Sequence, residues 1–325
     1  MTQVPLNKTD AAETIPSRRR RRRFSRQRAL ELAVPYALIL PVIVALGAVL
    51  GYPMYRLVVM SFQKYDLPQI VAHKGVWIGL DNYRLILGDQ LFWHVLLRTA
   101  IFTAANVGLT IVGGTLIALL LLKIHPVMRV LLTSGLILVW SMPPVVAVQI
   151  WRWMINYDNG VLNYMLSGFQ TFGGYYGHDW LATPFWQLTM VTTLIVWGAL
   201  PFVVVTVYAG LAQVPAELVE AAQVDGARSW RTFRDVTFPI LRPIFLILTS
   251  LSIIWDFGVF TQAWLLITNE QTGPGNFIMG TYLYKASFQA TEYGKGAAIS
   301  LIILLIVAVM SVFYVRKMVQ IGDVE

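Results

Sequence analysis

The sequence predicts an all-α membrane protein with six transmembrane helices, and composition and pattern carry that prediction. Hydrophobic residues make up 57% of the 325 residues and charged residues only 13%, whereas soluble domains are about 25% charged. The mean hydropathy is +0.62. The apolar residues occur in long runs, without the period-two alternation over about ten residues that is typical of a membrane β-strand.

A spanning helix needs about 20 mostly apolar residues, and six runs reach that length. They cover residues 34–60, 95–122, 127–151, 186–211, 244–267 and 296–315. Pro143 and Pro144 interrupt the third run, so we expect a kink or a break there, because proline cannot donate a helix hydrogen bond. One membrane domain over residues 33–318 is predicted between a disordered basic tail, residues 1–32, and a C-terminal tail, residues 319–325.

Lysine and arginine are concentrated in alternate connections, and cytoplasmic loops carry the excess of these residues. Seventeen of the 25 fall in residues 1–32, 123–129, 212–243 and 316–317. We therefore expect both termini and the loop 212–243 to be cytoplasmic. The loops 61–94, 155–185 and 268–293 are then expected on the outer face.

The net charge of +8 comes largely from the run Arg18–Arg23. Basic tails can bind the phosphates of nucleic acids. In a membrane chain, the run is better interpreted as a tail that sets topology and contacts anionic lipid. We therefore expect membrane lipid, and no nucleic acid, among the partners.

The sequence holds no recognisable catalytic or metal motif. It lacks the G-x-x-x-x-G-K-[ST] phosphate loop and the G-x-S-x-G nucleophile motif. Zero cysteines exclude disulfides and thiolate ligands, and the histidines are scattered at His73, His94, His125 and His178. We expect a chain that is not catalytic by itself and holds no metal or cofactor.

Asp256 is the one ionisable residue that lies clearly in the middle of a predicted span, and such residues usually face a cavity or a partner. Ser252, Trp255 and Asp256 are spaced i, i+3 and i+4, so they share a helix face. An aromatic ring beside a hydroxyl and a carboxylate suits a sugar, because the ring can stack on the C–H face while the acid accepts from hydroxyls. Alternatively, Asp256 bonds to a neighbouring helix and Trp255 only packs.

The fourth predicted span contains Gly198 and Pro201 within the turn from Trp197 to Phe202. Proline removes a helix hydrogen bond and glycine loosens the same turn. Interrupted helices near the membrane centre often line substrate paths, although a simple kink explains the same residues equally well.

The polar segment 212–243 lies between two very apolar runs and predicts two short helices. Pro215 suits the first turn of a helix, and Glu217 and Glu220 favour its positive N-terminal dipole. Asp225–Gly226 is expected to end this helix, since glycine readily adopts the left-handed cap.

A second short helix is expected after that cap. Ser229 is suited to capping its N-terminus, and we expect Pro239 to end it. Two short helices at an angle would form a rigid knob that fits a cleft on a partner. An ordinary amphipathic loop at the membrane surface is the alternative.

Sequence motifs in this segment resemble a known family. The letters EAAQVDGA from Glu220 and FPILRP from Phe238 to Pro243 resemble the EAA loop of the membrane subunits of bacterial ABC importers. Other motifs resemble the carbohydrate-type permeases: Gly79–Tyr83, Phe92 and Arg98–Ala100 upstream, and Gly273–Gly275, Tyr282–Tyr284, Phe288 and Tyr293–Gly294 downstream.

The resemblance covers about residues 35–318, with two departures. Residues 268–273 stand where the family more often has a shorter Gly-rich turn. The chain also lacks the extra N-terminal spans and the large outer domain of the enteric maltose permease.

The resemblance implies a type I ABC importer permease fold in the bacterial inner membrane, with the EAA loop as the segment that couples to an ATPase. The coupling residues that it implies are Glu220, Ala221, Ala222, Asp225, Gly226, Arg228, Phe233 and Pro239. The family's sugar contacts, counted from Glu220, fall on Gly198, Ala199, Phe202, Ser252, Trp255 and Asp256.

The implied function is uptake of a sugar by alternating access, with a disaccharide such as trehalose or maltose as cargo, as in the actinobacterial trehalose importers. The implied partners are a second homologous permease subunit, two ATPase subunits that bind ATP and Mg, and an extracytoplasmic sugar-binding lipoprotein.

Three alternatives remain open. One is a glycerol-3-phosphate ABC importer permease, although a phosphate dianion would want arginine or lysine in the path and Asp256 would repel it. Another is a secondary carrier, which would show internal repeats and more intramembrane charges. The third is a membrane enzyme that uses Asp256, Asp158 or Asp179 as a catalyst.

Overall fold

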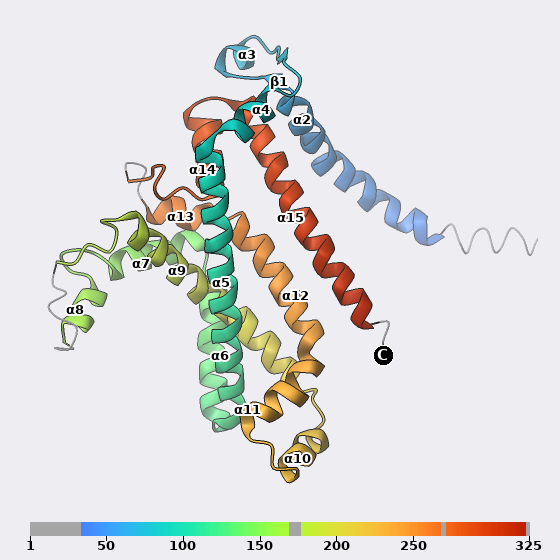
Figure 1. The fold of residues 1–325 in the computed structure, drawn as a ribbon, viewed down its shortest axis with the longest axis vertical. Coiled ribbons are helices and arrows are strands. Elements are labelled where there is room, and N and C mark those ends of the chain that lie inside the picture. The colour runs from blue at the N-terminus through green and yellow to red at the C-terminus, as the bar shows by residue number, and fades with distance from the viewer. Residues whose placement is uncertain (1–33, 169–176, 268–270, 323–325) are drawn as a thin grey trace, which may run out of the picture. The chain divides into compact units, whose positions relative to one another are not determined.

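The computed structural model describes residues 34–168, 177–267 and 271–322. The predicted basic tail with Arg18–Arg23 lies outside the described residues, as do residues 268–270 of the unusual outer turn. The chain divides into two units, residues 1–57 and 58–325 (Figure 1). The described part of the first unit is helical. This helix contains a π-helical turn, η1 (Gly47–Gly51), and then continues as α2 (Tyr52–Ser61).

In the described residues, five helical segments are long and apolar enough to cross a membrane. The first is Val34–Ser61. The other four are α5 (Gln90–Lys123), α9 (Pro184–Leu211), the segment Ser229–Phe257 that ends in α12 (Phe238–Phe257), and the apolar part of α15 (Tyr293–Gly322).

A bent pair of helices supplies a sixth span if the pair counts as one crossing. Helices α6 (Pro126–Trp140) and α7 (Pro144–Met154) are bent by 105° relative to each other. The break lies at Pro143–Pro144, where two consecutive residues have no N–H to donate to the preceding turn. The predicted interruption of the third span is therefore confirmed.

The fifth predicted span, residues 244–267, is wrong at both ends. Helix α12 begins at Phe238 and ends at Phe257, Gly258 follows, and α13 (Thr261–Leu266) is a separate helix. Ala263 and Leu266 are buried within the protein. Hydropathy alone cannot distinguish a short buried helix from the end of a lipid-facing span, since both are apolar.

Glycines let α5 approach α9 closely. A Cβ atom at Gly114 would lie 2.5 Å from Cγ1 of Val203 on α9. Small residues at helix contacts are typical of membrane bundles, where close packing drives association. Figure 1 shows α5, α9 and α12 together at the centre of the second unit.

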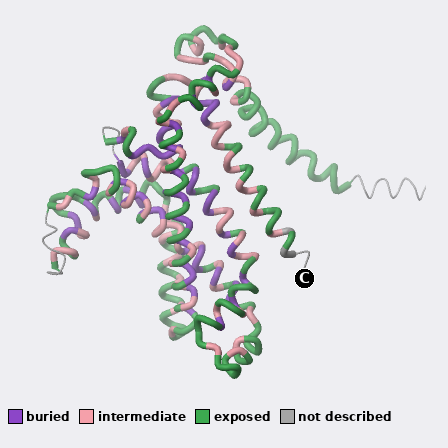
Figure 2. The backbone as a smooth tube through the Cα atoms, viewed as in Figure 1, coloured by how far each residue is buried: buried purple, intermediate pink, exposed green. Residues whose placement is uncertain are grey.

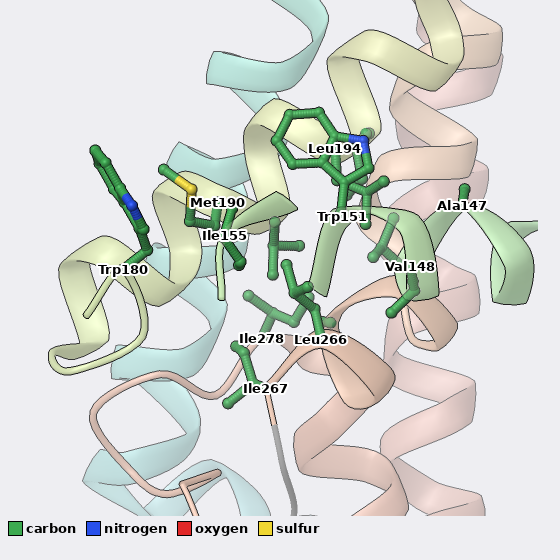
Figure 3. Close-up of a cluster of buried hydrophobic side chains, with 14 of the residues drawn as sticks. Ala147, Val148, Trp151, Ile155, Trp180, Met190, Leu194, Leu266, Ile267 and Ile278 are labelled. Carbon is green, nitrogen blue, oxygen red and sulfur yellow. The ribbon is translucent and has the colours of Figure 1, made fainter. Parts of the chain in front are cut away.

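Three clusters of buried apolar side chains hold the second unit together. Figure 2 marks along the backbone which residues are buried. The middle cluster joins α7, α9 and α13 and includes Trp151, Leu194 and Leu266 (Figure 3). A second cluster joins α5 to α4 (Asp81–Gly88), α14 (Met279–Tyr284) and α15. The third joins α5, α9 and α12 near the loop 212–243.

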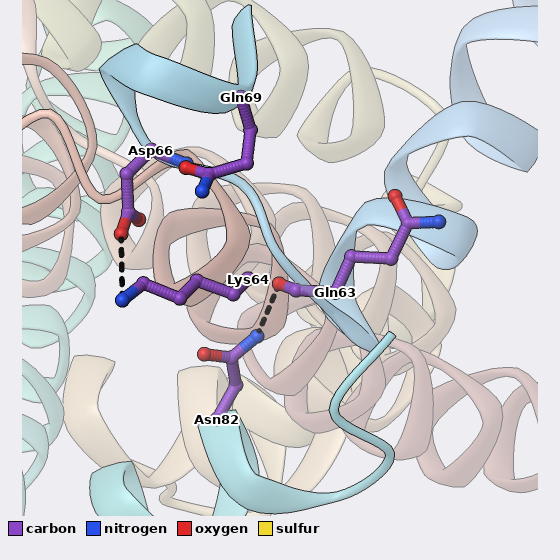
Figure 4. A network of polar contacts seen from close by, with 5 residues as sticks. All are labelled: Gln63, Lys64, Asp66, Gln69 and Asn82. Atoms are coloured by element: carbon purple, nitrogen blue, oxygen red, sulfur yellow. Dashed lines mark hydrogen bonds and ion pairs between the residues drawn. The ribbon is translucent and has the colours of Figure 1, made fainter. Parts of the chain in front are cut away.

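A small folded segment precedes α5 at the end that is expected to face outward. Strands β1 (Gln63–Lys64) and β2 (Val76–Trp77) pair antiparallel around α3 (Leu67–Val71). Asn82 is buried, and its Nδ2 donates to the carbonyls of Ser61 and Gln63, both at 2.9 Å (Figure 4). Elsewhere the described chain adds α8 (Val161–Ser167) and the π-helical turn η4 (Lys285–Gln289).

Candidate functional site

The loop 212–243 begins with α10 (Ala216–Val224), which has a Schellman C-terminus. The N–H of Ala227 donates to the carbonyl of Ala222 at 2.9 Å, and that of Gly226 to the carbonyl of Gln223 at 3.0 Å. Gly226 has φ +80°, which an L side chain rarely adopts. The predicted end of the helix at Asp225–Gly226 is confirmed.

The second helix of the loop differs from its prediction. Helix α11 (Ser229–Thr232) begins after Arg228, so Ser229 is the first helical residue rather than the cap. Pro239 does not end it either, because α11 continues through η3 (Phe233–Thr237) directly into α12.

The π-helical turn η3 explains how the helix passes Pro239. Phe238 N–H donates to the carbonyl of Phe233, five residues back. The wider turn adds one residue to the helix just ahead of the proline, whose ring would clash with a carbonyl four residues back in a regular α-helix. The second half of the loop, from Ser229, and the span α12 are therefore one continuous helical element.

Most residues of the loop 212–243 are exposed to solvent in this chain. Of the predicted coupling residues, Glu220, Ala221, Asp225, Gly226, Arg228 and Pro239 are exposed, and Ala222 and Phe233 are partly buried. Large apolar side chains are exposed beside them, since Val224 is 87% and Trp230 72% exposed. Asp235 forms ion pairs with Arg231 and Arg234 at 3.5 and 3.7 Å.

Aromatic rings connect this loop to the membrane part of α12. The ring centroids of Trp230 and Phe233 are 5.9 Å apart, those of Phe233 and Phe238 6.2 Å, and those of Phe238 and Phe245 5.3 Å. Such pairs stabilise beyond simple burial. The series gives the loop a stiff connection to the span.

A cavity of about 490 Å³ lies further along α12. Its walls come from α6, α7, α9, α12 and the segment after Gly258. Five of the six predicted substrate-path residues line it: Gly198, Ala199, Phe202, Trp255 and Asp256. Ser252 does not; it is buried on α12, one turn before Asp256.

Aromatic side chains form one part of this cavity. Phe202 lies between Trp140 and Trp255, with ring centroids 6.0 and 5.6 Å away. Trp255 is 52% exposed. The rings therefore offer flat apolar faces to a bound molecule.

Asp256 supplies the acidic side chain of the cavity lining. It is 6% exposed. Thr261 and Gln262 add polar groups. The lining can therefore accept hydrogen bonds from hydroxyls and contact C–H faces, and it contains no lysine or arginine.

Sequence reasoning missed Trp140, Thr261 and Gln262 as cavity residues. Trp140 is the last residue of α6, directly before the proline break, and the other two follow Gly258. Helix breaks that expose side chains toward the membrane centre were the available signal. Pro201, in contrast, lies inside a continuous α9.

Hydrogen bonds hold the outer segment 271–285 onto the bundle. Arg98 Nη1 donates to the carbonyls of Pro274 and Phe277, both at 2.9 Å, and Met279 N–H donates to Thr99 Oγ1 at 2.9 Å. The Tyr282 hydroxyl donates to Asp89 Oδ2 at 3.5 Å. Burial, and then the Asp89 charge, raise the pKa of Tyr282 to about 12, so it stays protonated at neutral pH.

No cluster of three or more His, Cys, Asp or Glu side chains that could hold a metal ion occurs in the described part of the chain. The family model of the binding-protein-dependent transport system inner membrane component matches residues 110–319. The chain belongs to this family. It is a permease subunit of a sugar ABC importer, a non-catalytic, multi-pass component of the inner membrane.

Named relatives support the carbohydrate branch of the family. The diacetylchitobiose uptake system permease protein DasB of Streptomyces coelicolor is 39% identical over 91% of this chain and 89% of its own length. The trehalose/maltose transport system permease protein MalF of Thermococcus litoralis is 29% identical over 74% of this chain and 79% of its own.

A solved structure supports the type I ABC importer permease fold. A chain of a bacterial ABC transporter that imports the acidic polysaccharide alginate superposes with a TM-score of 0.74. It shares 21% identity and covers 92% of this chain and 99% of its own. The predicted fold class is confirmed.

Proposed function

We propose that this subunit carries a neutral, oligosaccharide-sized sugar, with a disaccharide such as trehalose or maltose as the first candidate, and that the cavity around Phe202, Trp255 and Asp256 binds it. One observation carries the proposal. Residues expected from sequence to contact sugar, on two different helices, line a single cavity of about 490 Å³. Pockets for small molecules usually measure about 300–1,000 Å³.

The chemistry of the lining favours an uncharged cargo. Asp256 is the acid in the lining, and no lysine or arginine contributes to it. A phosphate dianion would meet a carboxylate with no compensating cation, which disfavours a glycerol-3-phosphate importer. Sugar hydroxyls can donate to the carboxylate, while Trp255 and Phe202 stack on the apolar faces of the ring. The named diacetylchitobiose and trehalose/maltose relatives fit the same substrate class.

The proposed role of the loop 212–243 is to receive force from an ATPase subunit. Its exposed residues Glu220, Ala221, Gly226 and Arg228 form the contact, with both termini on the same cytoplasmic side. The proposed assembly contains a second homologous permease, two ATPase subunits and a sugar-binding lipoprotein. The support is an exposed loop that is internally capped, ion-paired and continuous with a span.

The mechanism then follows one helical element. When ATP binding closes the ATPase subunits, the loop moves with them. Through η3 the movement turns or tilts α12, which carries Trp255 and Asp256 at its other end. The cavity thereby opens to the outer face, and reversal after hydrolysis opens it to the cytoplasm.

The decisive experiment is ATP hydrolysis by the complete complex, purified in lipid with the partners encoded beside it. Activity would be measured with and without the binding protein and with a panel of disaccharides, monosaccharides and glycerol-3-phosphate. We expect stimulation by one disaccharide together with the binding protein. Stimulation by glycerol-3-phosphate alone, or hydrolysis indifferent to every sugar, would contradict the proposed cargo.

A further inference from the structure

A second hollow lies near the loop 212–243, away from the sugar cavity. It measures about 640 Å³ and is a groove between α5, the start of α12 and the end of α15. Apolar side chains form most of its wall, among them Leu116 and Leu119 of α5 and Phe238 and Phe245 of α12. The helices themselves pack closely enough to define it, since α5 and α12 share a buried cluster.

Two cations line this groove and no acid does. They are Arg242 of α12 and Lys317 of α15. No hydrogen bond or ion pair within the described residues is recorded for Arg242, and the Lys317 ammonium lies 5.2 Å from the ring centroid of Phe313. The neighbouring Arg231 and Arg234 differ, because Asp235 partly neutralises both.

A smaller apolar hollow of about 210 Å³ adjoins the groove. It lies between α12 and α15 and is lined by Ile247, Leu251, Tyr314 and Met318. Leu246 lines both hollows. The two apolar hollows therefore share Leu246 in their linings, and both cations line the larger one.

We propose that the groove binds an anionic phospholipid, its phosphate between Arg242 and Lys317 and its two acyl chains on either side of Leu246. Basic pockets between transmembrane helices on the cytoplasmic side suit anionic headgroups. Trp230, 72% exposed at the edge of the groove, is placed as an interfacial aromatic residue. The absence of any acid from this lining favours an anion over a basic peptide.

A lipid bound in this groove would affect the proposed coupling between the loop and α12. The groove is lined by Ser229, Trp230 and Phe233, at the junction where the loop becomes α12. A bound lipid would therefore pack against the turn through which the proposed movement passes. Anionic lipid should then favour the coupled state of the complex.

The test uses the full chain in its complex, in nanodiscs with a single label. The natural chain has no cysteine, so Thr249→Cys, at the groove wall, can carry one bimane fluorophore. Quenching would be measured as brominated phosphatidylglycerol or brominated phosphatidylcholine replaces unbrominated lipid. We expect brominated phosphatidylglycerol to reach half-maximal quenching at a lower mole fraction than brominated phosphatidylcholine. The expected difference is about fivefold for each of the two groove cations.

A matched pair of double variants assigns the effect. Arg242→Gln with Lys317→Gln removes both groove cations, whereas Lys123→Gln with Arg316→Gln removes two cations that do not line the groove. Retained sugar-stimulated ATP hydrolysis in the control pair, and retained assembly in both, reports correct folding. We expect only the groove pair to lose the preference for phosphatidylglycerol.

Three results would overturn the proposal. One is equal quenching by both lipids. Another is a preference that survives loss of both groove cations. The third is a label that neither lipid quenches in the assembled complex, which would mean that a protein segment fills the groove.

Discussion

The loop 212–243 and the cavity beside Trp255 are joined through α12 but are built in opposite ways. Asp256 in the cavity is 6% exposed, whereas Val224 in the loop is 87% exposed. The cavity is a space enclosed by α6, α7, α9, α12 and the segment after Gly258. The loop is a surface that contacts little of its own chain. Pro239 and Asp256 are seventeen residues apart, or about 25 Å along a helix.

This difference indicates how work and specificity are divided. The loop is stiffened locally by its Schellman cap, its ion pairs and its ring series, which suits the proposal that a partner pushes it without deforming it. The cavity uses side chains from elements that lie far apart in sequence, so their relative movement can change its shape. In the proposed function, specificity would reside where helices meet, and coupling would reside where the loop protrudes.

The largest expected effect comes from breaking the rigid cap of the loop. Gly226→Pro cannot adopt φ +80° and removes the N–H that bonds to Gln223. We expect ATP-driven uptake to be abolished while the protein remains in the membrane. Uptake of radiolabelled sugar into cells or proteoliposomes measures this, with membrane abundance determined in parallel.

Two further variants sharpen that result. Gly226→Asn is the matched control, since asparagine tolerates the left-handed region, and it should retain most uptake. Glu220→Lys reverses a charge on the exposed face without altering the backbone, and it should also abolish uptake. Normal transport by both Gly226→Pro and Glu220→Lys would remove the coupling role from this loop.

The connection between loop and cavity can be broken separately. Deleting Val236 would remove the extra residue of η3, and in the regular helix that results the ring of Pro239 would clash with the carbonyl one turn before it. We expect uptake to fall about a hundredfold, as for other ångström-scale misplacements, while sugar-independent ATP hydrolysis persists. Val236→Ala keeps the register and is the control. Uptake by the deletion variant equal to that of the control would show that the register of η3 does not matter.

Much of this arrangement could be predicted from local patterns. Pro143 and Pro144 remove two consecutive backbone hydrogen-bond donors, so a helix break is expected there whatever the surrounding structure. Gly226 follows a short amphipathic helix, which is the setting of a left-handed cap. The spacing of Ser252, Trp255 and Asp256 places them on one face of any helix, and the structure brings two of them to the cavity.

The rest depends on contacts that no local pattern contains. The apolar residues after Gly258 look like the end of a span, but they fold back as α13 and pack on α7 and α9. Proline often ends a helix, but at Pro239 the chain continues as a helix through the extra residue of η3. Trp140 reaches the cavity because α6 and α7 bend by 105°, and sequence predicted the bend but not its angle.

A cavity variant should have a smaller effect and leave coupling intact. Trp255→Ala removes the ring beside Phe202, and we expect the sugar concentration for half-maximal uptake to rise roughly tenfold, equivalent to about 1.4 kcal/mol. Ile254→Ala changes the adjacent residue, which does not line the cavity, and should have little effect. Equal affinity in both variants would place the sugar elsewhere.

The smallest effect on transport should come from the outer end, which neither encloses the cavity nor protrudes toward an ATPase. Asn82→Ala removes two hydrogen bonds and leaves the carbonyls of Ser61 and Gln63 without this donor. Unsatisfied buried groups cost about 1–3 kcal/mol each, so we expect thermal unfolding about 5 °C lower. Arg84→Ala, whose side chain is 79% exposed, is the control and should leave the midpoint unchanged. Differential scanning fluorimetry of the purified complex measures both.

Because the lost contacts lie outside both regions, sugar affinity and the ratio of transport to hydrolysis should stay at their normal values below the unfolding temperature. A changed ratio of transport to hydrolysis would mean that the outer end takes part in coupling. The proposed assignment of sugar binding to the cavity and of force transmission to the loop would then be incomplete.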